Sequence, residues 1–418
     1  MIDYPNKLNI IFDKLNKFKI KPIIVGGYIR DKLLNLDSKD IDIELYGINS
    51  LDALEIILEE FGDVNSVGKS FGVCKLKFDE LDIDFSLPRT DSKISEGHRG
   101  FTITTDSALD FETASSRRDF TINAMGYDVT EKKLLDPFNG KKDLQHSLLK
   151  AVDILKFGED PLRVLRAVQF ASRFDFTLTP QLLLKCKKMI QNGVLRQLPK
   201  DRIFAEIQKL LLKAKRPSSG LSLLKELGTF VYFKELSYLT TEEFYLLLKR
   251  VDYLAKQNIE CKNRKLAVFF ALISSDLSKE NSLAFLRLLT DKKELLSEVI
   301  SMQSYLHSSP LADYTDYDLY KLAMHVNIEF FMYFTDAYTL GKEMQQIDAL
   351  RDRAEELSIF NHKAEAILQG RDLIALGLKP SPRFSKLLSE AYEAQISTQF
   401  TSHEEALNWL KKRLNQSS

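Results

Sequence analysis

The chain has 418 residues, of which 44% are hydrophobic and 28% are charged, and its 59 basic residues equal its 59 acidic residues in number. These values are typical of globular proteins with a sizeable core, and the length allows about two to four domains. The longest dense apolar run, Leu266 to Ile273, is too short to cross a bilayer, so no membrane partner is expected. The first residues lack the basic and then apolar layout of a secretory signal. The cysteines, Cys74, Cys186 and Cys261, form no C-x-x-C pair, which favours a reduced, cytoplasmic setting over a disulfide framework or a zinc site.

The first part of the chain has the pattern of a mixed α/β domain. In chain order, the pattern predicts a helix over 5–18, a strand over 22–27, a helix over 28–36, a strand over 40–47, a helix over 51–62, and two neighbouring strands over 72–78 and 81–87. Gly62 is predicted to cap the third of these helices. From about residue 150 onward the apolar spacing is almost purely helical, which predicts domain boundaries after residues 148, 216 and 340.

The charges are unevenly distributed along the chain. Residues 1–149 contain 20 Lys and Arg against 26 Asp and Glu, whereas residues 150–216 contain 15 against 6. A basic segment between acidic ends can attract an anionic partner although the total charge is zero. The alternative is a set of lysine-rich helix faces in contact with water.

Paired carboxylates occur on two of the predicted strands. Residues two apart on a strand share a face, so Asp40, Asp42 and Glu44 lie together, as do Asp82 and Asp84 on the other strand. Two such strands side by side could hold a hard cation such as Mg²⁺. For either strand alone, the alternative is a solvated polar face.

A glycine pair precedes the first of these strands by 13 residues. Gly26 and Gly27 would allow a phosphate to approach the backbone closely at the start of a helix. Arg30, one turn into that helix, has donors suited to phosphate oxygens. A tight turn is the simpler explanation of Gly-Gly alone, but the combination with Asp-x-Asp favours a metal and triphosphate site.

The helix predicted near residue 160 carries a stripe of charge. Asp160, Arg163 and Arg166 recur at i, i+3 and i+6, which places them on one face. A carboxylate accepts hydrogen bonds and a guanidinium donates them, so together they match a base edge with an amine beside a ring acceptor, as in cytosine and adenine. The structural alternative is that Asp160 only caps the helix, with Pro161 at its first position.

A second arginine-rich segment, SSRRDFTINAM at residues 115–125, carries Arg118, Asp119 and Asn123. In the functional interpretation, Arg118 contacts a triphosphate and Asp119 or Asn123 lies near the sugar. The alternative is a charged helix start with Asp119 as its cap.

Four segments occur in the order and rough spacing of one known family: GGYIRDKLL followed by DIDIEL, then RRDFTINAM, DPFNGKKDL and EDPLRVLRAVQF. In these segments the chain resembles the class II tRNA nucleotidyltransferases, which comprise CCA-adding enzymes, their CC-adding and A-adding relatives, and bacterial poly(A) polymerases. The resemblance covers residues 20–230 or so and is fainter in LQGRDLIALGLKPSP near the C-terminus.

This resemblance implies an α+β fold in which a polymerase-β-like nucleotidyltransferase palm, a mixed sheet with helices, is followed by all-helical domains. The domains would be the palm or head at 1–148, a neck for base recognition at 149–216, a body at 217–340, and an RNA-binding tail at 341–418.

The resemblance also assigns roles to individual residues. Asp40 and Asp42 would be Mg²⁺ ligands, with Asp84 at the place of a third catalytic carboxylate. Gly27, Arg30 and Arg118 fall where the family contacts the triphosphate, and we place Gly26, Asp119 and Asn123 in the same nucleotide site. Asp160 and Arg163 fall where the family reads the incoming base, with Arg166 beside them.

The implied activity is the template-independent addition of C and A to the 3′ end of tRNA from CTP and ATP, with release of pyrophosphate. A CC-adding or A-adding specialist, a poly(A) polymerase and an inactive RNA-binding protein are the alternatives.

Two features depart from the family pattern. The segment from Pro88 to Ile103 departs from the loop associated with switching from C to A addition, and Gln169 stands where many relatives carry an arginine. No histidine is followed by aspartate, so no HD phosphohydrolase activity is expected. DNA is not an expected partner, and the oligomeric state is left open.

Overall fold

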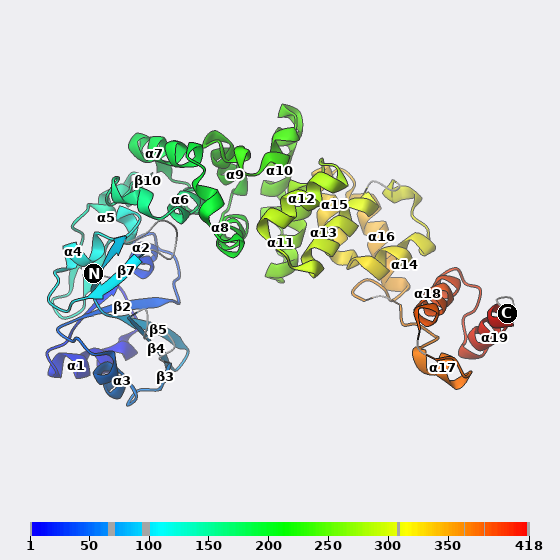
Figure 1. Cartoon of the computed structure of the whole chain (residues 1–418), viewed down its shortest axis with the longest axis horizontal. Coiled ribbons are helices and arrows are strands. Elements are labelled where there is room, and N and C mark those ends of the chain that lie inside the picture. Colours follow the sequence, from blue (N-terminus) through cyan, green and yellow to red (C-terminus); the bar gives the residue numbers. More distant parts are fainter. Residues whose placement is uncertain are drawn as a thin grey trace. The chain divides into compact units, whose positions relative to one another are not determined.

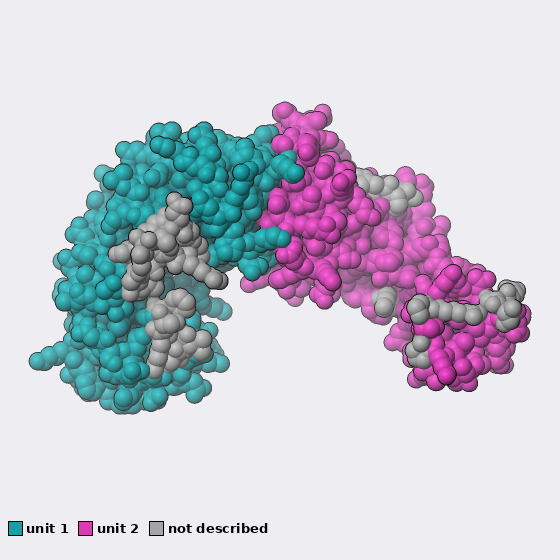
Figure 2. Space-filling model, in the orientation of Figure 1, with its two compact units in different colours: residues 1–234 teal, residues 235–418 magenta. Residues whose placement is uncertain are grey.

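A computed structural model describes residues 2–65, 72–93, 101–306, 310–362, 364–379 and 381–415. The chain forms two compact units, Met1–Lys234 and Glu235–Ser418, which Figure 2 shows in teal and magenta. All the strands that the structure describes belong to the first unit, and the described part of the second unit is built of helices (Figure 1). The prediction of an α+β fold, a mixed sheet followed by an all-helical region, is therefore confirmed.

A seven-stranded mixed sheet forms the centre of the first unit. Its order is β3-β4-β5-β2-β1-β8-β9, in which β2 and β5 run parallel and the other neighbours antiparallel. The strands are β1 Lys21–Val25, β2 Ile41–Tyr46, β3 Asp63–Asn65, β4 Val73–Phe78, β5 Leu81–Ser86, β8 Gly126–Asp128 and β9 Lys133–Leu135. In β4 every second side chain is buried, and in β5 Ile83 and Phe85 are buried, as the alternating sequence predicts.

Helices pack around this sheet, and the two longest bury an apolar stripe. They are α1 Asn9–Lys17, α2 Gly27–Leu33, α3 Leu51–Leu58, α4 Phe111–Ser115 and α5 Gly140–Gln145. Helix α1 buries Ile11, Phe12 and Leu15, and α2 contacts both β1 and β2. A separate hairpin is formed by β6 Arg89–Lys93 and β7 Phe101–Thr105. The segment of the departing loop at residues 94–100 lies outside the described residues.

The first unit continues as a helical segment after a short parallel pair, β10 Leu148–Leu149 and β11 Thr177–Leu178. Its helices are α6 Leu162–Phe174, α7 Pro180–Gln191, α8 Lys200–Lys213 and α9 Pro217–Glu226. Helix α6 packs against α8 and α9 and is buried over most of its length. This central place fixes the direction in which the remaining polar stripe of α6 faces.

The second unit contains α10 to α19. Their bounds are α10 Thr241–Ala255, α11 Lys262–Ile273, α12 Lys279–Leu289, α13 Lys293–Leu306, α14 Asp316–His325, α15 Ile328–Thr339, α16 Met344–Glu356, α17 Gly370–Ala375, α18 Pro382–Ile396 and α19 His403–Asn415. The apolar run at 266–273 is buried in α11. Among the described residues, no helix combines the length and the apolar character needed to cross a membrane.

Two local predictions were wrong. Helix α3 ends at Leu58 with Glu59 as its C-cap, so Gly62 does not cap it. A Cβ at Gly62 would lie 2.3 Å from the carbonyl oxygen of Lys77, so this glycine allows close passage beside β4. Helix α6 begins at Leu162, one residue later than predicted, with Pro161 at its N-cap.

Candidate active site

One cavity of the first unit collects most of the predicted site residues. Its volume is about 430 Å³. It is formed where the turn after β1, the first residues of β2, the segment after α4 and the polar stripe of α6 meet. The lining residues are Gly27, Arg30, Asp42, Arg117, Arg118, Asp119, Asn123, Asp160, Arg163, Arg166 and Phe170. Gly26, Asp40 and Asp84 are the predicted site residues that do not line it.

The glycine turn brings β1 against the arginine-rich segment. Gly26 has a φ of +72°, which favours glycine, and its N–H donates to the carbonyl oxygen of Met125 at 3.1 Å. A Cβ at Gly26 would lie 2.6 Å from Nη1 of Arg118 and 3.8 Å from Oδ2 of Asp42. Gly26 therefore lets the guanidinium of Arg118 and the carboxylate of Asp42 approach each other at the cavity wall.

The two predicted carboxylate strands are neighbours in the sheet. Asp42 on β2 is the register partner of Asp84 on the parallel strand β5, and Asp40 directly precedes β2. Nζ of Lys75 binds both carboxylate oxygens of Asp84, at 2.7 and 2.8 Å. Loss of hydration raises the pKa of Asp42, and the charges of Asp84 and Asp40 add to that effect, while Arg118 opposes it. The site thus carries negative charge that a further cation would stabilise.

These carboxylates fit a divalent cation with two protein ligands. Among the residues that the structure describes, no three His, Cys, Asp or Glu side chains gather closely enough to hold a metal by themselves. Mg²⁺, however, is commonly bound through one or two carboxylates, with substrate phosphates and water completing its shell. Asp42 with Asp84 or Asp40 provides such oxygen donors. In this structure the ammonium of Lys75 neutralises Asp84 in place of a metal ion.

Glu44 shares the polar face of β2 but belongs to a different group of contacts. Its carboxylate is fully buried, accepts a hydrogen bond from the hydroxyl of Tyr46 at 3.0 Å, and pairs with Arg117 at 3.4 Å. Burial, followed by the charge of Glu44, raises the pKa of Tyr46. Glu44 therefore anchors Arg117, which lines the cavity. The alternation of polar residues along a strand does not by itself distinguish this role from metal binding.

Arg118 lines the cavity with part of its donor capacity unused. Nη1 donates to the carbonyl oxygen of Asn123 at 3.2 Å, whereas Nε has no hydrogen-bond partner within the described residues. Burial lowers the pKa of Arg118, and the carboxylates of Glu44 and Asp42 partly counter that effect. A half-buried guanidinium whose Nε is buried without a partner among the described residues is suited to an anionic ligand.

Asp119 and Asn123 form a buried hydrogen-bonded network with two arginines. Oδ2 of Asp119 accepts from Nε and Nη2 of Arg166, at 2.7 and 2.5 Å, and Oδ1 accepts from Nδ2 of Asn123 at 3.0 Å. Oδ1 of Asn123 in turn accepts from Nη1 of Arg30 at 2.5 Å. Asp119 does not start a helix, because only a 3-10 turn, Thr121–Asn123, follows it. Its pKa is lowered, since Arg166 and these hydrogen bonds outweigh its burial.

Asp160 and Arg163 face the same cavity from the start of α6. Oδ1 of Asp160 accepts from the backbone N–H of Leu162 at 3.0 Å, so the carboxylate both caps the first turn and lines the cavity. Nη2 of Arg163 donates to the carbonyl oxygen of Arg117 at 2.7 Å. The i, i+3, i+6 stripe predicted from the sequence is therefore brought to the arginine-rich segment. Phe170, which no motif singled out, continues the stripe into the cavity wall.

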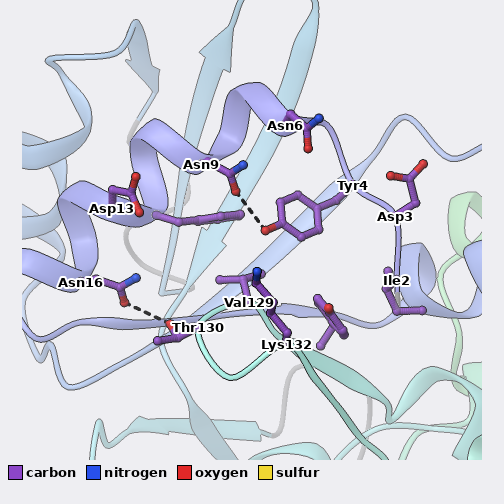
Figure 3. A pocket seen from close by; sticks show the side chains of 12 residues that line it. Ile2, Asp3, Tyr4, Asn6, Asn9, Asp13, Asn16, Val129, Thr130 and Lys132 are labelled. Carbon is purple, nitrogen blue, oxygen red and sulfur yellow. Dashed lines mark hydrogen bonds between the residues drawn. The ribbon is translucent and has the colours of Figure 1, made fainter.

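A larger cavity, about 590 Å³, lies elsewhere in the first unit, between the N-terminal segment, α1 and the turn after β8. Figure 3 shows its side chains, with hydrogen bonds from Tyr4 to Asn9 and from Thr130 to Asn16. Its charged lining residues are Asp3, Asp13 and Lys132, so acids outnumber bases. This balance does not favour a triphosphate, and the arginine-lined cavity remains the candidate active site.

Three family models match consecutive parts of the chain. They are described as the poly A polymerase head domain, matching residues 23–150, the probable RNA and SrmB-binding site of polymerase A, matching 175–239, and a putative tRNA nucleotidyltransferase domain 2, matching 259–410. The first model contains the glycine turn, the carboxylate strands and the arginine-rich segment.

Curated relatives carry related names. The chain is 32% identical over 336 residues to the CCA-adding enzyme of Blochmanniella floridana, covering 77% of this chain and 76% of that protein. It is 36% identical over 205 residues to the multifunctional CCA protein of Chromobacterium violaceum, covering 49% of this chain and 48% of that protein. The chain thus spans about half the length of this multifunctional relative.

Solved structures match the fold over nearly the whole chain. The Bacillus stearothermophilus CCA-adding enzyme in complex with CTP has a TM-score of 0.74 at 21% identity, over 99% of both chains. The Thermotoga maritima CCA-adding enzyme complexed with tRNA-CCA has a TM-score of 0.62 at 22% identity, over 99% of this chain and 97% of that one. At these identities the likeness concerns the fold alone.

Proposed function

Since this chain belongs to the family of CCA-adding enzymes, we propose that it adds C and A to the 3′ end of tRNA, using CTP and ATP and releasing pyrophosphate. Enzymes of this family are nucleotidyltransferases that use divalent metal ions, and we propose Mg²⁺ as the ion here. The observation that carries the proposal is one cavity in which Asp42 and Arg118 lie together with the Asp160 and Arg163 pair.

The proposed reaction is a transfer of one nucleotidyl group. The terminal ribose hydroxyl of the RNA attacks the α-phosphorus of CTP or ATP, a new P–O bond forms, and the bond to the bridging oxygen breaks to release pyrophosphate. The hydroxyl proton passes to solvent or to a nearby carboxylate. Mg²⁺ held by Asp42 with Asp84 or Asp40 would neutralise charge on the phosphates and favour ionisation of the hydroxyl.

The arginines of the cavity suit the triphosphate. Arg118 faces the cavity beside Asp42 and has an Nε without a hydrogen-bond partner among the described residues, so it is the first candidate for a phosphate contact. Gly26 and Gly27 allow the phosphates to approach the backbone. Arg30 also lines the cavity, although it is already bonded to Asp31 and Asn123.

The choice of base is proposed to depend on the start of α6. Asp160 offers an acceptor and Arg163 offers donors on the same face, a pattern that complements the amine and ring nitrogen of cytosine or adenine. Uracil and guanine present a carbonyl oxygen where the amine would be, so Asp160 would repel it. Asp119 and Asn123 lie next to this pair and are proposed to face the ribose.

The remaining sequence predictions form part of the same proposal. The domain boundaries after residues 148, 216 and 340 assign base recognition to the neck and RNA binding to the tail. tRNA would be held by its acceptor stem and 3′ end, largely through shape and phosphate contacts. The cysteines Cys74, Cys186 and Cys261 are free thiols, in keeping with the cytoplasmic setting that is expected.

An incorporation assay tests the proposal. Three tRNA transcripts, ending before CCA, after C and after CC, are incubated with purified protein and Mg²⁺, with CTP and ATP supplied separately and together. Products are then sized at nucleotide resolution. We expect stepwise completion of CCA from the bare end, stopping there. Extension only to CC, addition of the last A alone, or a long A tail would each reassign the product, and no addition to any transcript would contradict the proposed activity.

A further inference from the structure

Arg30 is buried between two helices of the first unit. Its side chain is about 5% exposed, and its neighbour Asp31 about 8%. Oδ1 of Asp31 accepts from Nε of Arg30 at 2.8 Å and lies 2.6 Å from Nη2. Burial lowers the pKa of Arg30, and Asp31 provides the largest opposing effect. Arg30 therefore directs two nitrogens at one oxygen of Asp31 in a buried ion pair, in which each partner compensates the desolvated charge of the other.

The same guanidinium lies against two aromatic rings of α6. Phe170 and Phe174, one turn apart, stack with 5.9 Å between ring centroids and 12° between ring planes. The guanidinium carbon of Arg30 lies 5.1 Å from the centroid of Phe170 and 4.8 Å from that of Phe174. These are distances at which a cation is attracted to the face of a ring.

A second ion pair ties the two helices together. Nη2 of Arg173 on α6 lies 3.5 Å from Oδ2 of Asp31 on α2, and its guanidinium also covers the ring of Phe174 at 4.7 Å. We call Arg30, Asp31, Phe170, Arg173 and Phe174 the α2–α6 clasp. It joins the helix that follows the glycine turn to the helix that carries Arg163 and Arg166.

Asp31 and Phe174 belong to the clasp but do not line the cavity. A direct contact with nucleotide is therefore not their role in this structure. They hold Arg30, whose Nη1 continues the connection through Asn123 and Asp119 to Arg166. Small displacements of substrate-positioning groups lower the rate and selectivity of an enzyme. If α6 were held less firmly, Asp160 and Arg163 would therefore be placed less accurately against the base.

We propose that Asp31 and Phe174 are positioning residues for base selection, acting through Arg30 to fix α6 relative to the glycine turn and Asp42. This inference rests on the proposed function, because it assumes that Asp160 and Arg163 read the base. Loosening the clasp should preserve the catalytic carboxylates and their chemistry. It should reduce discrimination between CTP and UTP.

The test compares Asp31→Asn and Phe174→Leu with a matched control in the full-length protein. Phe61→Leu serves as the control because Phe61 is also partly buried and contacts another ring, that of Phe78, at 6.5 Å between centroids. kcat/KM is measured for CTP and for UTP on the bare-ended tRNA, and melting temperatures are recorded for all variants. We expect both clasp variants to retain addition of C while the CTP to UTP ratio falls about tenfold, and the control to keep the wild-type ratio at a similar loss of melting temperature.

An unchanged ratio in both clasp variants would overturn the inference, and so would an equal fall in Phe61→Leu. If Asp31→Asn fails to fold, the CTP to UTP ratio of Phe174→Leu alone decides whether the clasp acts in base selection. Equilibrium binding of CTP and UTP, measured by calorimetry, separates this inference from the proposed function. If the wild type binds CTP more tightly than UTP without transferring it, the proposed function fails, and the ratio of dissociation constants in the variants still decides the role of the clasp.

Discussion

At the scale of single residues, Asp42 is exposed to the cavity, yet partial loss of hydration and the carboxylates of Asp84 and Asp40 raise its pKa against the opposing charge of Arg118. A carboxyl whose pKa is higher in the folded than in the unfolded state reduces stability once the pH exceeds both values. We therefore expect Asp42→Asn to raise the melting temperature at pH 7, with the difference vanishing below about pH 4. Calorimetry across the range of about pH 3 to 8 measures this directly.

The same substitution should lower nucleotide addition about a hundredfold or more, because it removes one metal-binding carboxylate. Asp82→Asn is the matched control, since Asp82 is exposed on β5 and pairs in register with Lys77. The control should leave both the pH dependence and the rate unchanged. Wild-type turnover of Asp42→Asn would refute the metal assignment, and a lower melting temperature at pH 7 would refute the electrostatic argument.

Lys75 is a residue that no sequence motif indicated, yet it binds both oxygens of Asp84. An ammonium at this place competes with a metal ion for the same carboxylate. We expect Lys75→Met to tighten binding of Mn²⁺, used as a probe in the absence of nucleotide, by about three- to tenfold, in keeping with the modest value of exposed ion pairs. Electron paramagnetic resonance titration measures free Mn²⁺.

Lys77→Met is the control for this titration, because it removes the same charge from the same strand, opposite Asp82 rather than Asp84. Equal tightening in both variants would show a general charge effect and exclude specific competition at Asp84. Weaker Mn²⁺ binding in Lys75→Met would mean that Lys75 orders Asp84 for the metal.

At the scale of elements, the sequence was most informative where a pattern has a single geometric meaning. The i, i+3, i+6 spacing of Asp160, Arg163 and Arg166 predicts that they share one helix face, and the cavity receives all three. Strands β2 and β5, which share one carboxylate pattern, are neighbours in the sheet, as a common metal site would require. The role of these residues stays a prediction until activity is measured.

Elements that depend on contacts distant in sequence could not be predicted. The short strands β8 and β9 carry too few residues for a periodic signal. Strand β8 forms because β1 offers it an edge, and β9 then pairs with β8. By its position in the sequence, Glu44 belongs to the same face of β2 as Asp42. Its actual partner, Arg117, lies 73 residues away and could not be identified from the local pattern. The clasp likewise joins α2 to a distant helix, since Arg30 contacts Phe174, which no local pattern reveals.

Helix α7 provides an element-scale test of RNA binding. It belongs to the basic segment 150–216, and Lys188 is exposed while Lys185 is partly exposed. We expect the double change Lys185→Glu and Lys188→Glu to weaken tRNA binding. The slope of log K against log salt should also become shallower, by about 0.7 to 0.9 for each phosphate that the variant no longer neutralises. Filter binding between about 50 and 200 mM salt measures both quantities.

Lys133→Glu, an exposed charge reversal on β9, is the control for overall charge. It should shift affinity slightly and leave the salt slope as in the wild type. Wild-type affinity and slope in the α7 variant would remove this helix face from the proposed RNA surface.

At the scale of the whole molecule, the candidate active site is confined to one compact unit. Every residue that lines the arginine-lined cavity lies within Met1–Lys234, as do the carboxylates on β2 and β5. The second unit has a core of its own, including the cluster formed by Leu373, Leu387 and Leu410. Binding of a single nucleotide should therefore depend on the first unit, whereas binding of a large RNA can use both.

We expect a chain truncated after Lys234 to fold and to bind CTP with Mg²⁺ within about threefold of the full-length affinity, since no lining residue is removed. Its tRNA affinity should fall about a hundredfold or more, because phosphate contacts contribute cumulatively to RNA binding. Circular dichroism establishes that the fragment is folded, and calorimetry and filter binding give the two affinities. A folded fragment that fails to bind CTP would contradict the confinement of the site to the first unit, and undiminished tRNA binding would contradict RNA contacts by the second.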